Sequence, residues 1–361
     1  MPRACTRLGW LVLCYALALL SGCTFGGGAF TVKFVSRSFG ILDLRTGRTA
    51  YVPREGHAEK LLRTDDRSRT FRTLYLSHNH KHFVMRTITY EGKVLEEREV
   101  PIFGRGYVAI YHVQQGYALS PDASSMAYLD EQSAELRLLD LRSGKSRKVM
   151  ADLATDIVHV HTLEWLSDRE LLFAIDGTFG SKARIAVVDV ASGAVRVDLR
   201  PGAGSLLAGV KTDGAYLAYR DYNWNRRGFR IYDLRQAREI GEVIPGPDLD
   251  AGFERWSTDG EPRLLYIEST RDCRCKLKQY DVARKESKAL KSWDEPCIVY
   301  ICGTAGTKVF YKVRPFDPIR YPPSRLFVWD AATQTESEIK GVKTACMVRI
   351  VDGGNRVIYQ P

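Results

Sequence analysis

The chain repeats a short turn motif at nearly constant spacing, and this repetition constrains its fold more than any other feature. The clearest copies are LSPDASSMAY around Asp122, LSDRELLF around Asp168, KTDGAYLAY around Asp213, STDGEPRLLY around Asp259 and VDGGNRVIY around Asp352. Weaker copies surround Asn79 and Ala305, so successive copies lie 43 to 47 residues apart. Ser and Asp side chains cap tight turns through backbone N–H groups, and the residues after each turn alternate as a strand does.

A second motif, an apolar strand that ends in Asp, follows each turn after about 20 residues. Its copies are GILDLRTGR at Asp43, RLLDLRSGK at Asp140, AVVDVASGA at Asp189, RIYDLRQAR at Asp233, KQYDVARKE at Asp281 and FVWDAATQT at Asp330. Three copies place Gly four residues after the Asp, where a hairpin turn takes a positive φ. The copy missing between Asp43 and Asp140 is assigned to Glu91, only 12 residues after Asn79, so this unit is expected to be irregular.

A period of 43 to 49 residues with four short strands is typical of a β-propeller. Seven opening turns predict seven blades, and six or eight are the alternatives. The chain begins with the second motif and ends with the first, so its last two strands should complete the blade begun by its first two. The predicted fold is therefore all-β: a seven-bladed β-propeller of four-stranded blades, its ring closed by pairing of the N- and C-terminal strands.

These motifs resemble the TolB-type and WD-repeat-like propellers of bacteria, and the resemblance covers residues 30–361. TolB carries an additional α/β domain before its propeller, for which this chain has no room. The resemblance therefore implies a bare propeller without TolB's own role.

The first 22 residues have the pattern of a signal peptide. Arg3 and Arg7 precede an apolar run at residues 8–20, which is too short to span a bilayer. The run ends in LSGC, which resembles the lipobox of bacterial lipoproteins and implies that Cys23 is lipidated; a secretory signal with an incidental Cys is the alternative. Residues 23–29 are expected to form a flexible tether, and 30–361 the propeller.

The leader implies a lipid-anchored protein of the cell envelope. Thr24, rather than Asp, follows Cys23. By the same resemblance this favours the outer membrane, with the propeller facing the periplasm or the cell surface.

The net charge of +10 becomes +8 once Arg3 and Arg7 leave with the leader. Such a charge fits either a mildly basic solvated surface or a preference for anionic partners. Nucleic acid is not expected, because the chain has no basic helix or recognisable nucleic-acid module.

All seven histidines precede residue 162. His78, His80 and His82 alternate, but a His-rich turn is favoured over a metal site. A second group precedes the first strands of successive blades and could gather at the channel mouth: His57, His112, His159 and His161. No carboxylate cluster accompanies them, so no metal or cofactor is expected.

The cysteines other than Cys23 in the mature chain are Cys273, Cys275, Cys297, Cys302 and Cys346. Export favours disulfides over a four-thiolate zinc site. A bridge from Cys273 or Cys275 to Cys297 is predicted, with an odd thiol left over.

Two long loops, residues 220–228 and 313–325, should lie on the face of the propeller that carries the second-to-third-strand connections. They contain Trp224, Arg226, Arg227, Arg314, Phe316, Arg320 and Tyr321. Aromatic and Arg side chains often anchor interfaces, so these residues are predicted to bind the partner; variable solvated loops are the alternative.

No catalytic motif of the G-x-S-x-G, phosphate-loop or H-E-x-x-H type is present. The expected function is therefore a non-catalytic binding or scaffold module for an envelope protein or an anionic glycan. The alternative is an enzyme, a propeller hydrolase such as a lactonase with a metal at the channel mouth.

Overall fold

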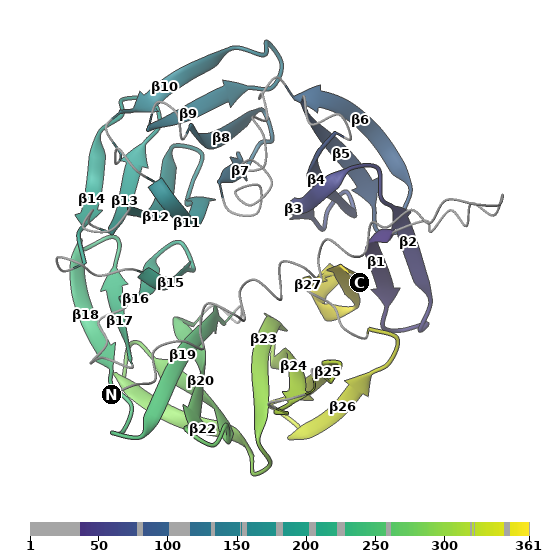
Figure 1. Ribbon diagram of the computed structural model, residues 1–361, viewed down its shortest axis with the longest axis vertical. Helices are drawn as coiled ribbons and strands as arrows, with labels where there is room; N and C mark the ends of the chain where they lie inside the picture. Colours follow the sequence, from purple (N-terminus) through teal and green to yellow (C-terminus); the bar gives the residue numbers. More distant parts are fainter. Residues whose placement is uncertain are drawn as a thin grey trace, which may run out of the picture. The chain divides into compact units, whose positions relative to one another are not determined.

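The computed structural model describes residues 37–77, 82–100, 116–130, 134–151, 153, 157–177, 183–201, 207–221, 228–257, 261–317, 320, 322–342 and 347–360. These residues form seven four-stranded antiparallel sheets around a common centre (Figure 1). The prediction of a seven-bladed, all-β propeller is confirmed. No helix within these ranges is long and apolar enough to cross a membrane.

Six blades are built from consecutive strands that run from the centre to the rim. The first three are β3 (His57–Asp65), β4 (Thr70–Leu76), β5 (Phe83–Thr89) and β6 (Val94–Val100); β7 (Tyr117–Leu119), β8 (Ser125–Asp130), β9 (Glu135–Asp140) and β10 (Ser146–Met150); and β11 (Ile157–Trp165), β12 (Glu170–Gly177), β13 (Arg184–Asp189) and β14 (Val195–Leu199). The next three are β15 (Leu207–Thr212), β16 (Tyr216–Asp221), β17 (Phe229–Asp233) and β18 (Arg238–Val243); β19 (Leu249–Trp256), β20 (Arg263–Thr270), β21 (Cys275–Asp281) and β22 (Glu286–Trp293); and β23 (Cys297–Ala305), β24 (Lys308–Pro315), β25 (Arg325–Asp330) and β26 (Thr335–Ile339).

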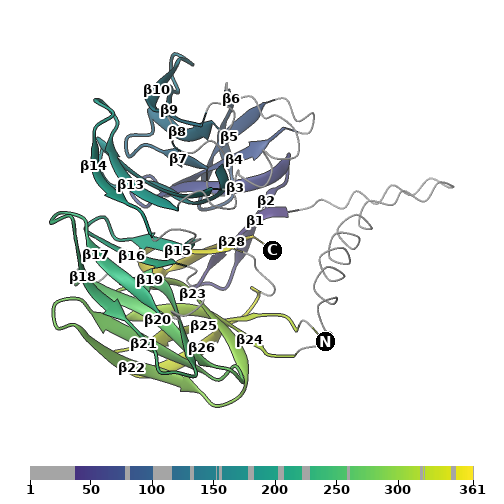
Figure 2. The ribbon, with the colours of Figure 1, turned by 60° about the vertical axis from the view of Figure 1, so that its left-hand side comes forward.

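The seventh blade joins the two ends of the propeller. It contains β1 (Arg37–Asp43), β2 (Thr49–Pro53), β27 (Met347–Val351) and β28 (Arg356–Gln360), in the order β2-β1-β28-β27. A short 3-10 helix, η2 (Asp352–Gly354), forms its opening turn. Strands β1 and β28 pair antiparallel, with Gly40 opposite Tyr359 (Figures 1 and 2). The predicted closure of the ring by N- and C-terminal strands is confirmed.

The hydrophobic core lies between the blades rather than within any one of them. Phe39 of β1 packs edge-on against Phe71 of β4, with ring centroids 5.8 Å apart, although the two strands belong to neighbouring blades. Each cluster of buried residues in the described ranges likewise combines side chains from two adjacent blades. A single blade therefore cannot bury its own faces, and the ring supplies the burial.

The repeated Asp residues hold the turns as the sequence predicted. Asp140 accepts hydrogen bonds from the backbone N–H groups of Arg142 and Ser143, at 3.0 and 2.6 Å. Gly144 then takes a φ of 67°, and Gly47 and Gly193 occupy the same place in their turns with φ of 69° and 75°. The left-handed conformation explains why Gly recurs four residues after the Asp.

One opening turn was assigned wrongly from the sequence. Asn79 does not open the blade of β3 to β6, because β3 and β4 are joined by the turn at Asp65, whose carboxylate accepts the N–H of Arg67 at 3.0 Å. The turn at Glu91 and Gly92 joins β5 to β6, as expected. The assignment failed because residues 101–115, which lie outside the described ranges, lengthen the connection to β7 and preserve the average period.

Candidate functional site

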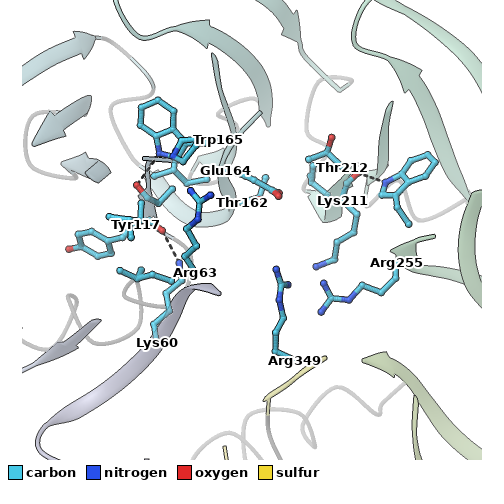
Figure 3. Close-up of a pocket in the computed structure, with 17 residues that line it drawn as sticks. Lys60, Arg63, Tyr117, Thr162, Glu164, Trp165, Lys211, Thr212, Arg255 and Arg349 are labelled. Carbon is cyan, nitrogen blue, oxygen red and sulfur yellow. Dashed lines mark hydrogen bonds between the residues drawn. The ribbon is translucent and has the colours of Figure 1, made fainter. Parts of the chain in front are cut away.

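A cavity of about 450 Å³ lies at the centre of the ring. Its walls are the inner strands of six blades, β3, β7, β11, β15, β19 and β27, so residues far apart in the sequence meet there (Figures 1 and 3). We call this cavity the central channel.

Positive charge dominates the described walls of the central channel. The charged lining residues are Lys60, Arg63, Glu164, Lys211, Arg255 and Arg349. Five of these six side chains are cationic, and they come from four different blades. Lys211, Arg255 and Arg349 converge from three inner strands, β15, β19 and β27, while Arg63 and Glu164 lie across the channel from them (Figure 3). The channel is therefore suited to an anionic ligand.

Two of the cations are held by backbone carbonyls of the next blade. Lys60 Nζ donates a hydrogen bond to the Tyr117 carbonyl oxygen at 2.9 Å, and Arg63 donates to the carbonyl oxygen of Ser120 at 2.8 Å. Both side chains start on β3 and cross to the β7 edge of the adjacent blade. Their positions are thus set by the packing of the two blades.

Tryptophan side chains fix the neighbouring inner strands in the same way. The indole N–H of Trp165 donates to the carbonyl oxygen of Ala118, and that of Trp256 to the carbonyl oxygen of Lys211, each at 3.1 Å. Each Trp directly follows a charged lining residue, Glu164 or Arg255. The bond to the preceding blade therefore anchors the strand segment that carries the charge.

Burial shifts the pKa values of two facing groups in the channel. Loss of hydration lowers the pKa of Lys60 from 10.5 to about 8, and the negative charge of Glu164 only partly opposes this effect. Loss of hydration likewise raises the pKa of Glu164, against the attraction of Arg349, Lys211, Arg255 and Lys60. Glu164 still exposes surface to the channel.

The described histidines have partners in their own or neighbouring blades. The Nε2 atom of His161 lies 2.7 Å from the Asp176 carboxylate, which also accepts the N–H of Leu207 from the next blade. His82 pairs with Glu99 at 3.0 Å. His78, His80 and His112 lie outside the described residues, as do the side chains of His57 and His159. Gathering of histidines at the channel mouth therefore stays a prediction.

Metal ligands do not cluster in the described part of the chain. No three His, Cys, Asp or Glu side chains among those residues come together as a metal site would require. No described residue set can therefore be assigned to a metal.

The loop residues predicted to bind a partner do not line the central channel, as far as the structure describes them. Arg314 belongs to β24, Phe316 is 44% exposed, and the backbone N–H of Arg320 donates to Asp317 at 2.9 Å. None of these three lines the central channel. Trp224, Arg226, Arg227 and Tyr321 lie outside the described residues. A binding role for these loop residues remains a prediction.

The cysteines predicted to form a disulfide lie side by side as thiols. Cys273, Cys275 and Cys297 are free thiols, and Cys346 lies outside the described ranges. The thiol of Cys275 donates to the Cys297 carbonyl oxygen at 3.1 Å. A hydrogen bond with the Cys297 thiol and burial raise the pKa of Cys275. The predicted pair is adjacent, without a bond between the sulfur atoms.

The charged channel residues were not identified from the sequence, although a signal for them exists. Four lie two to four residues before an opening-turn position: Glu164 before Asp168, Lys211 before Asp213, Arg255 before Asp259 and Arg349 before Asp352. Charged side chains at equivalent places in inner strands indicate a polar channel, since inner strands otherwise favour apolar residues.

Comparison with known proteins gives structural neighbours only. No protein-family model matches the chain, and no curated protein matches it. An oligogalacturonate lyase solved in complex with manganese is similar with a TM-score of 0.59 and 14% identity, over 90% of this chain and 96% of the lyase. Oligopeptidase B from Leishmania major gives a TM-score of 0.53 and 10% identity, over 82% of this chain and 43% of that protein. TolB from Acinetobacter baumannii gives a TM-score of 0.41 and 12% identity, over 100% of this chain and 71% of TolB.

The expectation of a non-catalytic binding or scaffold module is corrected by these comparisons. The neighbours with TM-scores above 0.5 include a lyase and an oligopeptidase, both of which are enzymes. At these identities the similarity establishes the β-propeller fold, and the reaction has to be inferred from the chemistry of the site. No catalytic motif along the chain indicates this site, because the channel residues come from separate blades.

Proposed function

We propose that the protein is an enzyme that binds an acidic oligosaccharide in the central channel and cleaves it as a lyase. The observation that carries the proposal is the ring of cations, Lys60, Arg63, Lys211, Arg255 and Arg349, around the single described carboxylate of the lining, Glu164. The name of the similar lyase describes a substrate of the same chemical type, a chain of acidic sugars.

The chemistry of such a substrate matches the channel. A uronate unit carries a carboxylate, and β-elimination needs that carboxylate neutralised while the proton on the adjacent carbon is removed. The cationic side chains of Lys211, Arg255 and Arg349 point into the same part of the channel, where together they could neutralise a substrate carboxylate (Figure 3). Arg can bind a carboxylate through two parallel hydrogen bonds, which orients the sugar as well as neutralising it.

The test uses purified protein with oligogalacturonate, a second uronate oligosaccharide and a neutral glucose oligosaccharide. Elimination leaves a double bond conjugated to the carboxylate, which absorbs ultraviolet light. We expect this absorbance to grow with the acidic substrates alone. New reducing ends without this absorbance would show that the protein cleaves by hydrolysis and not by elimination. Absence of any cleavage of acidic oligosaccharides would contradict the proposal.

A charge-removal variant tests the site itself. Lys211→Met, Arg255→Met and Arg349→Met together should raise KM for acidic substrates by at least about tenfold, since hydrogen bonds to charged groups contribute about 1.5–3 kcal/mol each. The matched control removes three exposed cations elsewhere, with Arg142→Met, Lys145→Met and Lys340→Met. An equal rise in KM for both variants would indicate a general effect of net charge.

We also propose that the enzyme is anchored in the cell envelope through lipid on Cys23, with the outer membrane as the favoured site. The support is the leader and its LSGC sequence. Stable anchoring requires two or more acyl chains, which lipoprotein processing supplies. Cys23→Ser should move the protein from the detergent phase to the aqueous phase. Unchanged partitioning of this variant would contradict lipidation.

A further inference from the structure

Lys60, like Arg63, borders the central channel while its side chain is held by a backbone carbonyl of the next blade. Its amine nitrogen is anchored to the Tyr117 carbonyl, 2.9 Å away, yet the side chain borders the cavity. The charged and titratable groups of the lining that face the same space are Arg63, Tyr117, Glu164, Lys211, Arg255 and Arg349. Glu164 is the carboxylate among them, and its charge acts on Lys60.

We propose that Lys60 is the catalytic base of the channel, which removes the proton from the carbon next to the substrate carboxylate. This inference rests on the proposed function and deepens it. The neutral amine takes the proton, the electron pair of the C–H bond becomes the new C=C bond, and the C–O bond to the leaving sugar breaks. The ammonium then returns its proton to the leaving oxygen, so the amine is restored and no oxidant or reductant is needed.

The other cations of the channel are less suited to this step. Arg63, Arg255 and Arg349 carry guanidinium groups, which have no lone pair available to accept a proton and do not act as bases in proteins. Lys211 is exposed, whereas loss of hydration brings the pKa of Lys60 to about 8, close to neutral pH. A base is most effective when its pKa lies near the pH at which the enzyme works.

Glu164 acts as a positioning residue for Lys60. Its negative charge raises the pKa of Lys60 against the larger effect of burial. Removing that charge should therefore lower the pKa of Lys60 further and move the acidic side of the pH–rate profile to lower pH. A merely structural role of Glu164 would change the maximal rate and leave the profile in place.

The first experiment replaces Lys60 by a residue that keeps the charge and cannot act as a base. Lys60→Arg should retain substrate binding, followed through the fluorescence of Trp165 and Trp256 in the channel wall. We expect turnover to fall by about a hundredfold or more, as for loss of a general base. Lys145→Arg, on an exposed turn, is the matched control. Turnover within a few fold of wild type in Lys60→Arg would overturn the proposal.

The second experiment needs no substrate. The protein is reductively methylated with ¹³C, and the lysine resonances are followed against pH by NMR. One resonance should titrate near pH 8, be absent from Lys60→Arg and titrate lower in Glu164→Gln. Titration of Lys60 together with the exposed lysines would overturn the proposal. If Lys60 titrates near 8 but no acidic oligosaccharide is cleaved, the proposed function fails and the assignment of a reaction to Lys60 fails with it.

Discussion

At the scale of single residues, the repeated aspartates do more than mark the period. Asp122 accepts hydrogen bonds from the Ser120 hydroxyl at 2.6 Å and from the Ser124 backbone N–H at 3.1 Å. The hydroxyls of Ser120 and Ser124 and this N–H lower the pKa of Asp122 from 3.8 to about 2. Because the folded pKa is depressed, this carboxylate stabilises the fold above about pH 4, and the contribution disappears as the pH falls through about 2.

We therefore predict a stability difference at Asp122 that depends on pH. Asp122→Asn should have a lower Tm than wild type at neutral pH, because the amide is a weaker acceptor for the turn. The gap should shrink between about pH 4 and pH 2, where wild-type Asp122 becomes protonated. Circular dichroism melts across this range measure it. A gap that stays constant to pH 2 would show that the carboxylate charge contributes nothing.

At the scale of strands, the start of β21 touches the start of the next blade. The backbone N–H of Cys297 donates to the Cys273 carbonyl at 2.8 Å, and the Cys275 thiol lies against the Cys297 carbonyl. A bond between Cys275 and Cys297 would link two blades whose contact is otherwise non-covalent. The leader predicts export, and exported proteins form disulfides.

We predict that the exported protein carries the Cys275–Cys297 disulfide. Alkylation without reductant, followed by mass spectrometry of peptides, should leave these two thiols unlabelled. Protein retained in the cytoplasm by deletion of residues 1–22 is the control and should be labelled at both. Labelling of Cys275 and Cys297 in exported protein would rule the bond out.

At the scale of the whole propeller, stability depends on the closing blade, because it alone unites the two ends of the described chain. Arg356 of β28 ties this blade to the next: its guanidinium donates to the Tyr90 carbonyl at 2.9 Å and lies 3.0 Å from Glu91. Carboxylate oxygens of Asp43 and Asp352 lie 3.4 and 3.5 Å from nitrogen atoms of the same guanidinium group. Burial opposes ionisation of Asp43, but the N–H groups of Thr46 and Arg45 and the charges of Arg45 and Arg356 lower its pKa.

The blade count, the closure and most turns could be predicted because their determinants are local or periodic. Asp, Ser and Gly shape a turn within about five residues, so the motif at Asp140 predicts the same geometry wherever the chain carries it. The turn at Asn79 is the exception. Because the connection between β6 and β7 is long, the average spacing of the motifs stayed near the usual period even though Asn79 does not open its blade.

The arrangement of the charged channel was decided by tertiary structure. Its residues come from six blades, and although charged residues before the opening turns indicate a polar channel, no spacing along the chain shows that Lys60 faces the same cavity as Glu164 and Arg349. Register shifts between Leu61 and Arg63, between Val160 and Thr162 and between Phe253 and Arg255 also change which side chains face inward. Each such bulge reverses the alternation of a strand, so the inward face cannot be read from the pattern. The sequence by itself determined a closed ring of blades, whereas the charge at its centre, and the lowered pKa of Lys60 that follows from burial, exist only once the ring has formed.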